Sequence, residues 1–112
     1  MSECIFCKLA EISAGRSVLY EDDDIIAFPD IFPKYEFHIL IIPKKHLESV
    51  LDASLEDDEI LGKMLRVGGK IAREQGIADG GFRLLTNTGK NAGQSVQHLH
   101  VHLLGGEKLR PI

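Results

Sequence analysis

Hydrophobic residues recur along the chain at two spacings, one typical of helices and one typical of strands. Residues 4–11 carry apolar side chains at helical spacing and lead to Gly15, which predicts a short amphipathic helix. A longer helix is predicted between Ser54, which with Asp57 resembles a capping box, and Gly76. The chain is therefore expected to contain one short and one long helix.

Five further segments have the composition of β-strands: residues 17–20, 25–28, 37–42, 82–86 and 96–104. The first two flank an acidic turn, which predicts a hairpin. The third is a nearly continuous apolar run closed by Pro43, as expected of a central strand covered on both faces. Strands with so few helices between them predict one α+β domain, residues 1–112, with an antiparallel sheet of five strands.

Composition and charge exclude several classes of protein. The 112 residues are 44% hydrophobic and 27% charged, which is typical of a globular domain that buries a core without disulfide or metal support. No apolar run approaches the roughly 18 to 20 residues of a membrane span. The first residues lack the features of a secretory signal, so a cytoplasmic location and reduced cysteines are expected. The net charge of -4, with scattered lysines, argues against nucleic-acid binding.

The last predicted strand alternates two kinds of residue: His98, His100 and His102 against Leu99, Val101 and Leu103. Because strand side chains alternate between faces, this pattern predicts one imidazole face and one core face. An expression tag would not alternate in this way, while three structural histidines are the plainer alternative. A metal shared by all three is disfavoured, because the outer two would lie about 13 Å apart in a strand. The histidines are therefore expected to divide their roles, with His100 as nucleophile or general base.

Two other features carry candidate chemistry. In residues 87–95, glycines and the hydroxyl of Ser95 favour a phosphate-binding loop, although the spacing is not that of a P-loop. The pair Cys4 and Cys7 is compatible with a redox pair, half of a zinc site or two buried thiols. Redox chemistry is the least favoured of the three, because a thioredoxin-like motif follows a strand and only three residues precede Cys4.

The run from His98 to Leu104 matches the His-φ-His-φ-His-φ-φ signature, where φ is apolar, and the chain resembles the histidine triad superfamily. It is most similar to the bacterial type of histidine triad nucleotide-binding proteins, or purine nucleoside phosphoramidases. The resemblance extends through residues 4–8, 27–31, 38–46, 93–95 and 105–106. It implies a homodimer with a ten-stranded sheet.

The resemblance implies that His100 attacks the α-phosphorus of a purine nucleoside 5′-phosphoramidate. A covalent nucleotidyl-imidazole would form, and water would release the nucleoside monophosphate, without any cofactor in the chemistry. The backbone carbonyl of His98 would fix the tautomer of His100. The other residues implied at the reacting phosphate are His102, Ser95, the Gly93 amide and His38.

The remaining implied roles concern the nucleotide and a metal. Asp30 would bind the ribose hydroxyls, Asn87 would reach the sugar and phosphate, and Gln94 of the same loop is a further implied nucleotide-binding residue. The implied apolar walls of the purine site are Ile5, Phe6, Leu9, Phe28 and Ile31. Bacterial members of the resembled family imply a closed, structural zinc site at Cys4, Cys7, His46 and His98.

Two departures from the family pattern leave the leaving group open: Pro29 precedes Asp30, and residues 107–112 lack the tryptophan of eukaryotic relatives. One alternative is a dinucleoside polyphosphate hydrolase or nucleotidyl transferase that uses the same His100 chemistry. Gly105 and Gly106 favour the phosphoramidase branch over it. The other alternative is a nucleotide-binding or zinc-stabilised interaction module with little catalysis.

Overall fold

The computed structural model describes residues 4–11 and 17–112, with the backbone alone for residues 9–11. Its helices and strands are α1 (Ile5–Glu11), β1 (Tyr20–Glu21), β2 (Ile25–Pro29), β3 (Phe37–Pro43), α2 (Asp58–Glu74), β4 (Phe82–Leu85) and β5 (Val101–Gly105). Short 3-10 turns occupy Val50–Asp52, Leu55–Asp57 and Lys90–Ala92. Both predicted helices are present, while the side chain of Leu9 and the predicted helix end at Gly15 lie outside the described residues. No helix in the described part of the chain is long and apolar enough to span a bilayer.

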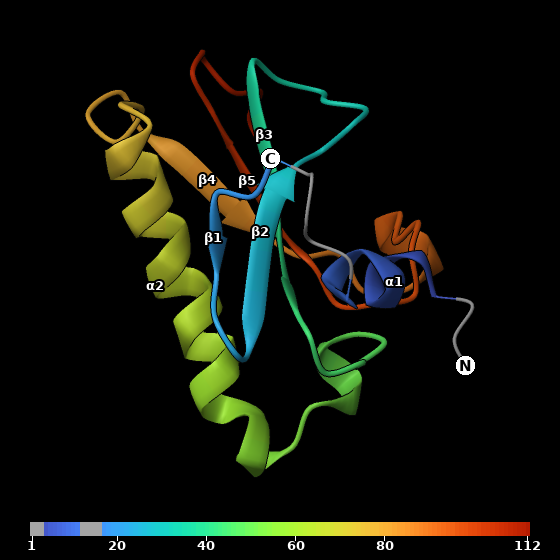
Figure 1. The fold of residues 1–112 in the computed structure, drawn as a ribbon. Helices are drawn as coiled ribbons and strands as arrows, with labels where there is room; N and C mark the ends of the chain where they lie inside the picture. The colour runs from blue at the N-terminus through green and yellow to red at the C-terminus, as the bar shows by residue number, and fades with distance from the viewer. Residues whose placement is uncertain (1–3, 12–16) are drawn as a thin grey trace.

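The five strands form one antiparallel sheet in the order β1-β2-β3-β5-β4, which confirms the predicted α+β architecture (Figure 1). The predicted hairpin is confirmed as β1 and β2, although β1 is shorter than expected. Its acidic turn is held by the carboxylate of Asp22, whose Oδ1 accepts from the N–H groups of Asp24 and Ile25 at 2.8 and 3.0 Å. An aspartate that bonds backbone groups two and three residues ahead stabilises a tight turn.

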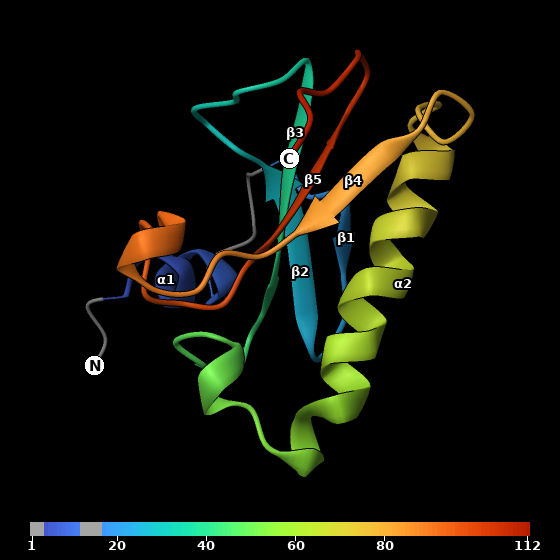
Figure 2. The same ribbon diagram turned by 180° about the vertical axis from the view of Figure 1, so that it is seen from behind.

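The sheet is covered on both faces, as predicted for its central strand. One face packs Ile25, Ile39 and Ile41 against the buried stripe of α2. On the other face, Leu40 and Phe6 belong to a second apolar cluster, and α1 lies on this side of the sheet (Figure 2). The second face is also the one that carries the candidate site, because β3 residues of the same parity as Leu40 point toward it.

The long helix begins after the predicted capping box. The N–H of Ser54 donates to Oδ2 of Asp57 at 2.9 Å, and the turn between them is 3-10, so α2 itself starts at Asp58. Gly76, at φ 79°, follows the helix in the left-handed region that favours glycine. The prediction of this helix is confirmed, with a start four residues after the predicted cap.

The predicted strand 96–104 is wrong for residues 96–100, because β5 starts only at Val101. The partner strand β3 ends at Pro43, which has no N–H to continue the ladder. The carbonyl of Pro43 is occupied by the imidazole of His98 at 2.8 Å, and the N–H of Leu99 instead donates to Leu47. The first two histidines of the triad therefore stand in an irregular segment.

Candidate active site and metal site

The histidines of the described chain gather in two groups around His100. We call Cys4, Cys7, His46 and His98 the thiol cluster, and Asp30, His38 and His102 the relay cluster. In each cluster, one ligand-type atom per residue lies within 4.8 Å of the others. His98 and His102 therefore belong to different groups, in agreement with the expectation that the triad divides its roles.

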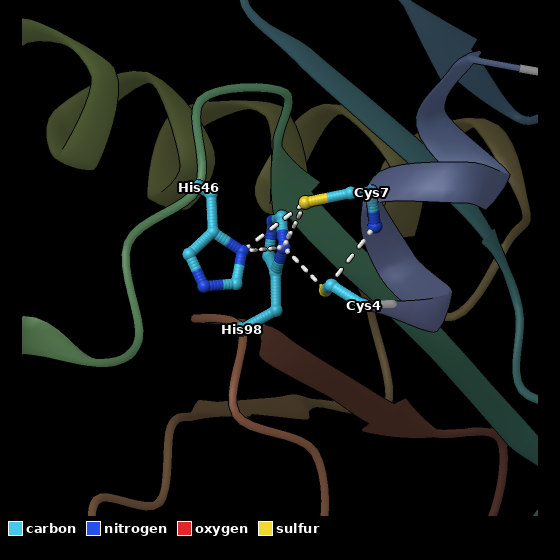
Figure 3. Close-up of side chains that lie close together, drawn as sticks. All are labelled: Cys4, Cys7, His46 and His98. Carbon is cyan, nitrogen blue, oxygen red and sulfur yellow. Dashed lines mark hydrogen bonds between the residues drawn. The ribbon is translucent and has the colours of Figure 1, made fainter. Parts of the chain in front are cut away.

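The thiol cluster joins three parts of the chain. Cys4 and Cys7 stand at the start of α1, His46 follows β3, and His98 precedes β5; Figure 3 shows the four side chains converging. The Nδ1 atom of His98 lies 3.3 Å from the sulfur of Cys4, 3.4 Å from that of Cys7 and 3.2 Å from Nδ1 of His46. The sulfur of Cys7 lies 3.1 Å from Nδ1 of His46. The edges of a tetrahedron of sulfur and nitrogen ligands around zinc measure about 3.3 to 3.8 Å, close to these separations.

The protonation of His98 also suits a metal ligand. Its Nε2 lies 2.8 Å from the carbonyl oxygen of Pro43, which only accepts, so the ring proton of a neutral imidazole sits on Nε2. The lone pair of Nδ1 then points into the thiol cluster. Burial lowers the pKa of His98, although the hydrogen bond to Pro43 opposes this shift, so the ring is neutral at physiological pH. Metal-bound histidines use their second nitrogen in the same way. The donor set therefore fits zinc.

His100 is buried, with 3% of its surface exposed, and its orientation is fixed on two sides. Its Nδ1–H donates to the carbonyl oxygen of His98 at 2.7 Å, which leaves the lone pair of a neutral ring on Nε2. The ring of Phe6 packs edge-to-face against it at 5.1 Å. Thr86 holds the backbone, since its hydroxyl donates to the carbonyl of His100 at 2.7 Å. Nε2 has no partner among the residues that the structure describes.

The relay cluster is a chain of hydrogen bonds with a defined direction. The N–H of Lys34 donates to Nδ1 of His38 at 3.0 Å, so the proton of a neutral His38 is on Nε2. That Nε2–H lies 2.9 Å from Nδ1 of His102 and 3.3 Å from Oδ2 of Asp30. His102 accepts at Nδ1 and therefore carries its own proton on Nε2. The relay cluster thus presents an N–H donor at His102, close to the His100 ring, whose centroid is 4.9 Å away.

Burial keeps both relay imidazoles neutral. It lowers the pKa of His102 to about 4, with further lowering from the nearby His100 and His38. Burial also lowers the pKa of His38, against the opposing effect of the Asp30 carboxylate. The tautomers deduced above therefore hold at physiological pH.

The loop between β4 and β5 is braced mainly by Gln94. Its amide oxygen accepts from the N–H of Gly89 at 2.8 Å, and its Nε2–H2 group donates to the carbonyls of Glu48 and Val96 at 2.6 and 3.0 Å. The amide of Gly93, which the family pattern assigns to the phosphate, donates to Lys90 at 3.0 Å. Of the two side chains of this loop expected at the sugar and phosphate, Ser95 is exposed and Asn87 is half-buried.

The residues expected to contact a purine differ in exposure. Phe6 and Phe28 are buried and stack edge-to-face with centroids 6.2 Å apart, whereas Ile5 and Ile31 are 53% and 78% exposed. Asp30, the expected ribose ligand, accepts the N–H of Phe32 at Oδ1 at 2.9 Å and is half-buried. Part of the expected purine site is therefore core, and part is exposed apolar surface.

Three supporting groups escaped the sequence analysis: the amide of Lys34, the hydroxyl of Thr86 and the carbonyl of Pro43. The first is a backbone group, which no residue type reveals, and Thr86 reads as the end of a strand. The carbonyl of Pro43 is likewise a backbone group: the proline reveals that an N–H donor is missing there, but not which group its own carbonyl accepts.

Comparisons with known proteins decide the family. The HIT domain model matches residues 12–109. The chain belongs to the HIT domain family. The resemblance stated from residues 98–104 is thereby confirmed.

Three relatives match this HIT protein over nearly their full length. It is 44% identical over 110 residues to a protein of Escherichia coli (strain K12) named purine nucleoside phosphoramidase, covering 98% of this chain and 92% of the relative. A HIT family hydrolase from Clostridium thermocellum superposes with a TM-score of 0.93 at 41% identity, covering 100% and 97% of the two chains. A histidine triad protein from Clostridium difficile superposes with a TM-score of 0.94 at 41% identity, covering 100% of this chain and 97% of the other. The fold and the family are thus established together.

Proposed function

We propose that this HIT protein hydrolyses purine nucleoside 5′-phosphoramidates, or related conjugates of a nucleoside monophosphate, through a nucleotidyl intermediate on His100. One observation carries the proposal: His100 is buried with Nδ1–H bonded to the His98 carbonyl, so that an unpartnered Nε2 lone pair remains among the described residues. The similarity to a protein named purine nucleoside phosphoramidase supports the substrate class.

In the first step, Nε2 of His100 forms a bond to the α-phosphorus while the bond to the leaving amine breaks, and the amine takes a proton from water. In the second step, water attacks phosphorus, the bond to Nε2 breaks with its electron pair returning to His100, and the water proton leaves to solvent. Such covalent catalysis divides one displacement into two. The Nε2–H of His102 and the hydroxyl of Ser95 are proposed to donate to the phosphoryl oxygens.

The nucleotide is proposed to bind along the second face of the sheet. Asp30 would accept the ribose hydroxyls on its remaining lone pairs, and Asn87 would contact the sugar and phosphate. The apolar side chains that we propose around the purine are Ile5, Phe6, Leu9, Phe28 and Ile31. Gln94 and the amide of Gly93 are proposed to shape the phosphate loop, since both have protein partners.

We also propose that the thiol cluster holds a structural Zn2+. Four protein ligands would close its coordination sphere, and when bound the ion would tie α1 to the sheet without entering the reaction. The separations of the donor atoms and the second-shell bond of His98 to Pro43 support this. A cytoplasmic location remains a prediction.

A homodimer is proposed as well, through the open edge of β4, whose residues Phe82–Leu85 are all half-buried. Pairing of two such edges would give a ten-stranded sheet. Light scattering on the purified full chain tests it: a monomer mass at micromolar concentration contradicts the dimer.

Mass spectrometry of a quenched reaction with adenosine 5′-phosphoramidate tests the reaction. We expect an adenylate adduct on His100 in the wild type and none in His100→Gln, whose amide occupies a similar volume but is a poor nucleophile. Turnover of His100→Gln at the wild-type rate would refute the proposal. A parallel reaction with a dinucleoside polyphosphate identifies the preferred leaving group, and binding of AMP without turnover of either substrate would indicate an interaction module.

A further inference from the structure

His98 belongs to both sites through different atoms. Its Nδ1 faces the sulfur atoms of Cys4 and Cys7, while its backbone carbonyl accepts the Nδ1–H of His100. The ring is also anchored at Nε2 by Pro43. Because both ring nitrogens are engaged, the ring restrains the position of the His98 backbone, whose carbonyl orients His100. One residue therefore connects the position of the thiols with the position of the proposed nucleophile.

Phe6 makes a second connection. It lies between the two cysteines on α1, is 7% exposed, and packs edge-to-face on the rings of His100 and His98 at 5.1 and 5.9 Å. A helix of seven residues is far below the length that is stable by itself in water. Its placement depends on what joins it to the rest of the fold, which includes the Phe6 ring and the two thiols. Release of the thiols would therefore loosen the aromatic wall against His100.

We propose that His98 and Phe6 are positioning residues that transmit the occupancy of the thiol cluster to His100. With Zn2+ bound, the His98 ring and α1 are fixed, so the carbonyl of His98 and the ring of Phe6 hold the nucleophile in one tautomer and one orientation. In the metal-free protein both restraints weaken, and the nucleotide site loses order. The inference rests on the proposed function and adds a form of regulation to it. The thiol cluster, which substrate does not enter, would set the geometry of the His100 imidazole.

The first test compares wild-type protein treated with a chelator and the same protein with one equivalent of Zn2+. In protein labelled with 15N at histidine, long-range 1H–15N spectra report the tautomer of each ring. We expect one Nδ1–H form of His100 with zinc and averaged shifts without it. The dissociation constant of AMP, measured by calorimetry, is expected to be about tenfold higher without zinc, as for loss of a supporting shell around a ligand. Identical His100 shifts and identical AMP affinity in the two states would overturn the inference.

The second test keeps the metal and removes one connection. Phe6→Leu retains all four donors, so its zinc content should stay at one ion per chain. Loss of the edge-to-face contact should shift the His100 resonances and weaken AMP binding roughly three- to tenfold in the zinc-loaded protein. This variant tests the connection between Phe6 and His100 even if the metal-free wild type unfolds, because it is measured with zinc present. Unchanged His100 resonances in zinc-loaded Phe6→Leu would contradict the packing connection.

Ile5→Ala is the matched control. Ile5 is the neighbour of Phe6 on α1 and is half exposed, so its truncation alters the proposed purine wall without removing a ring from His100. We expect the zinc-dependent change in His100 shifts and the ratio of the two AMP dissociation constants to match the wild type. A shift of the His100 resonances in zinc-loaded Ile5→Ala as large as that in Phe6→Leu would assign the effect to the purine wall and overturn the role of Phe6.

The outcomes separate this inference from the proposed function. A missing His100 adduct in zinc-loaded wild type would refute the proposed reaction, while the ring shifts would still report on the coupling. Failure to take up zinc would overturn the coupling and the metal proposal together, and an adduct formed by that protein would leave the hydrolase proposal standing.

Discussion

The thiol cluster and the relay cluster are alike in the spacing of their metal-ligating atoms, and their hydrogen bonds make them different. Both bring metal-ligating atoms within 4.8 Å of one another. In the thiol cluster, the outer nitrogen of His98 donates to Pro43, so the inner nitrogen offers a lone pair. In the relay cluster, the outer nitrogen of His38 accepts from the Lys34 amide, so the inner nitrogen carries a proton. Proximity alone therefore does not make a metal site; the tautomer set by the neighbouring backbone decides.

This difference assigns separate tasks to the two clusters. A lone pair that faces two thiols suits a cation, whereas a directed N–H donor at His102 suits the oxygens of a phosphate. His100 stands between them, bonded to His98 on one side and packed beside His102 on the other. The division can be tested by changing each cluster in turn.

Among variants of the two clusters, the largest effect on turnover is expected from His102→Ala. Loss of a donor to the phosphoryl oxygens should lower kcat/KM for the phosphoramidate about a hundred- to a thousandfold. The thiol cluster is untouched, so the zinc content should remain at one ion per chain by metal analysis. Wild-type turnover in this variant would mean that the relay cluster is structural only.

The thiol cluster is tested by Cys7→Ser. Binding of zinc at a concentration about a hundredfold above its dissociation constant should stabilise the wild type by about 2.7 kcal/mol, and raise its melting temperature by on the order of 10 °C. In Cys7→Ser most of this rise should disappear, while His102→Ala should keep it. An equal rise in Cys7→Ser, measured by calorimetry on untagged protein, would show that the ion binds elsewhere.

A smaller effect is expected from the supporting imidazole of the relay. His38→Leu removes the donor to His102, so His102 is free to adopt the other tautomer, and kcat should fall about tenfold with little change in KM. His38→Gln offers an amide N–H in its place and should recover part of the loss. The ring nitrogen shifts of His102 distinguish this role from a packing role: a merely structural His38 would leave them unchanged.

The smallest effect is a dependence of stability on pH. The pKa of His102 is about 4 in the folded protein and 6.5 in the unfolded chain, so the unfolded chain binds more protons between these values. The contribution of His102 to the free energy of unfolding is full above pH 6.5 and decreases as the pH falls toward 4.

His102→Gln should remove about 1 kcal/mol of this decrease, a modest figure because the ring is only partly buried. Urea unfolding near pH 7 and near pH 5, with chelator in all samples, measures the difference between variant and wild type. The same pH dependence in both proteins would contradict the depressed pKa of His102.

The fold was largely predictable because its periodicities are unambiguous. The apolar run of β3 and the long stripe of α2 each fit a single element, and the structure confirms both. The strand assigned to residues 96–100 failed for a reason that lies outside that segment. Alternation of histidine with leucine and valine is compatible with a strand, but the pairing of β5 with β3 stops at Val101 and Ile41, and the N–H of Leu99 donates to Leu47 instead.

The sequence predicted which residue types make up the site, but not the hydrogen bonds that set their protonation. Histidine and cysteine types, together with the family signature, identify the groups that carry chemistry. Their protonation depends on backbone groups from distant segments: Pro43 for His98, and Lys34 for His38. Those contacts form only when the chain folds, and no residue type announces which carbonyl or amide will be left over.

The amino-acid pattern alone was enough to predict the family, the order of helices and strands, and the candidate nucleophile His100, because these follow from local periodicity and from a signature of adjacent residues. Folding brings four ligand-type atoms from three segments together beside α1, and it fixes which nitrogen of each imidazole holds the proton. The physical reason is that a neutral imidazole has one proton for two nitrogens, and the hydrogen-bond partner at one of them fixes what the other can do.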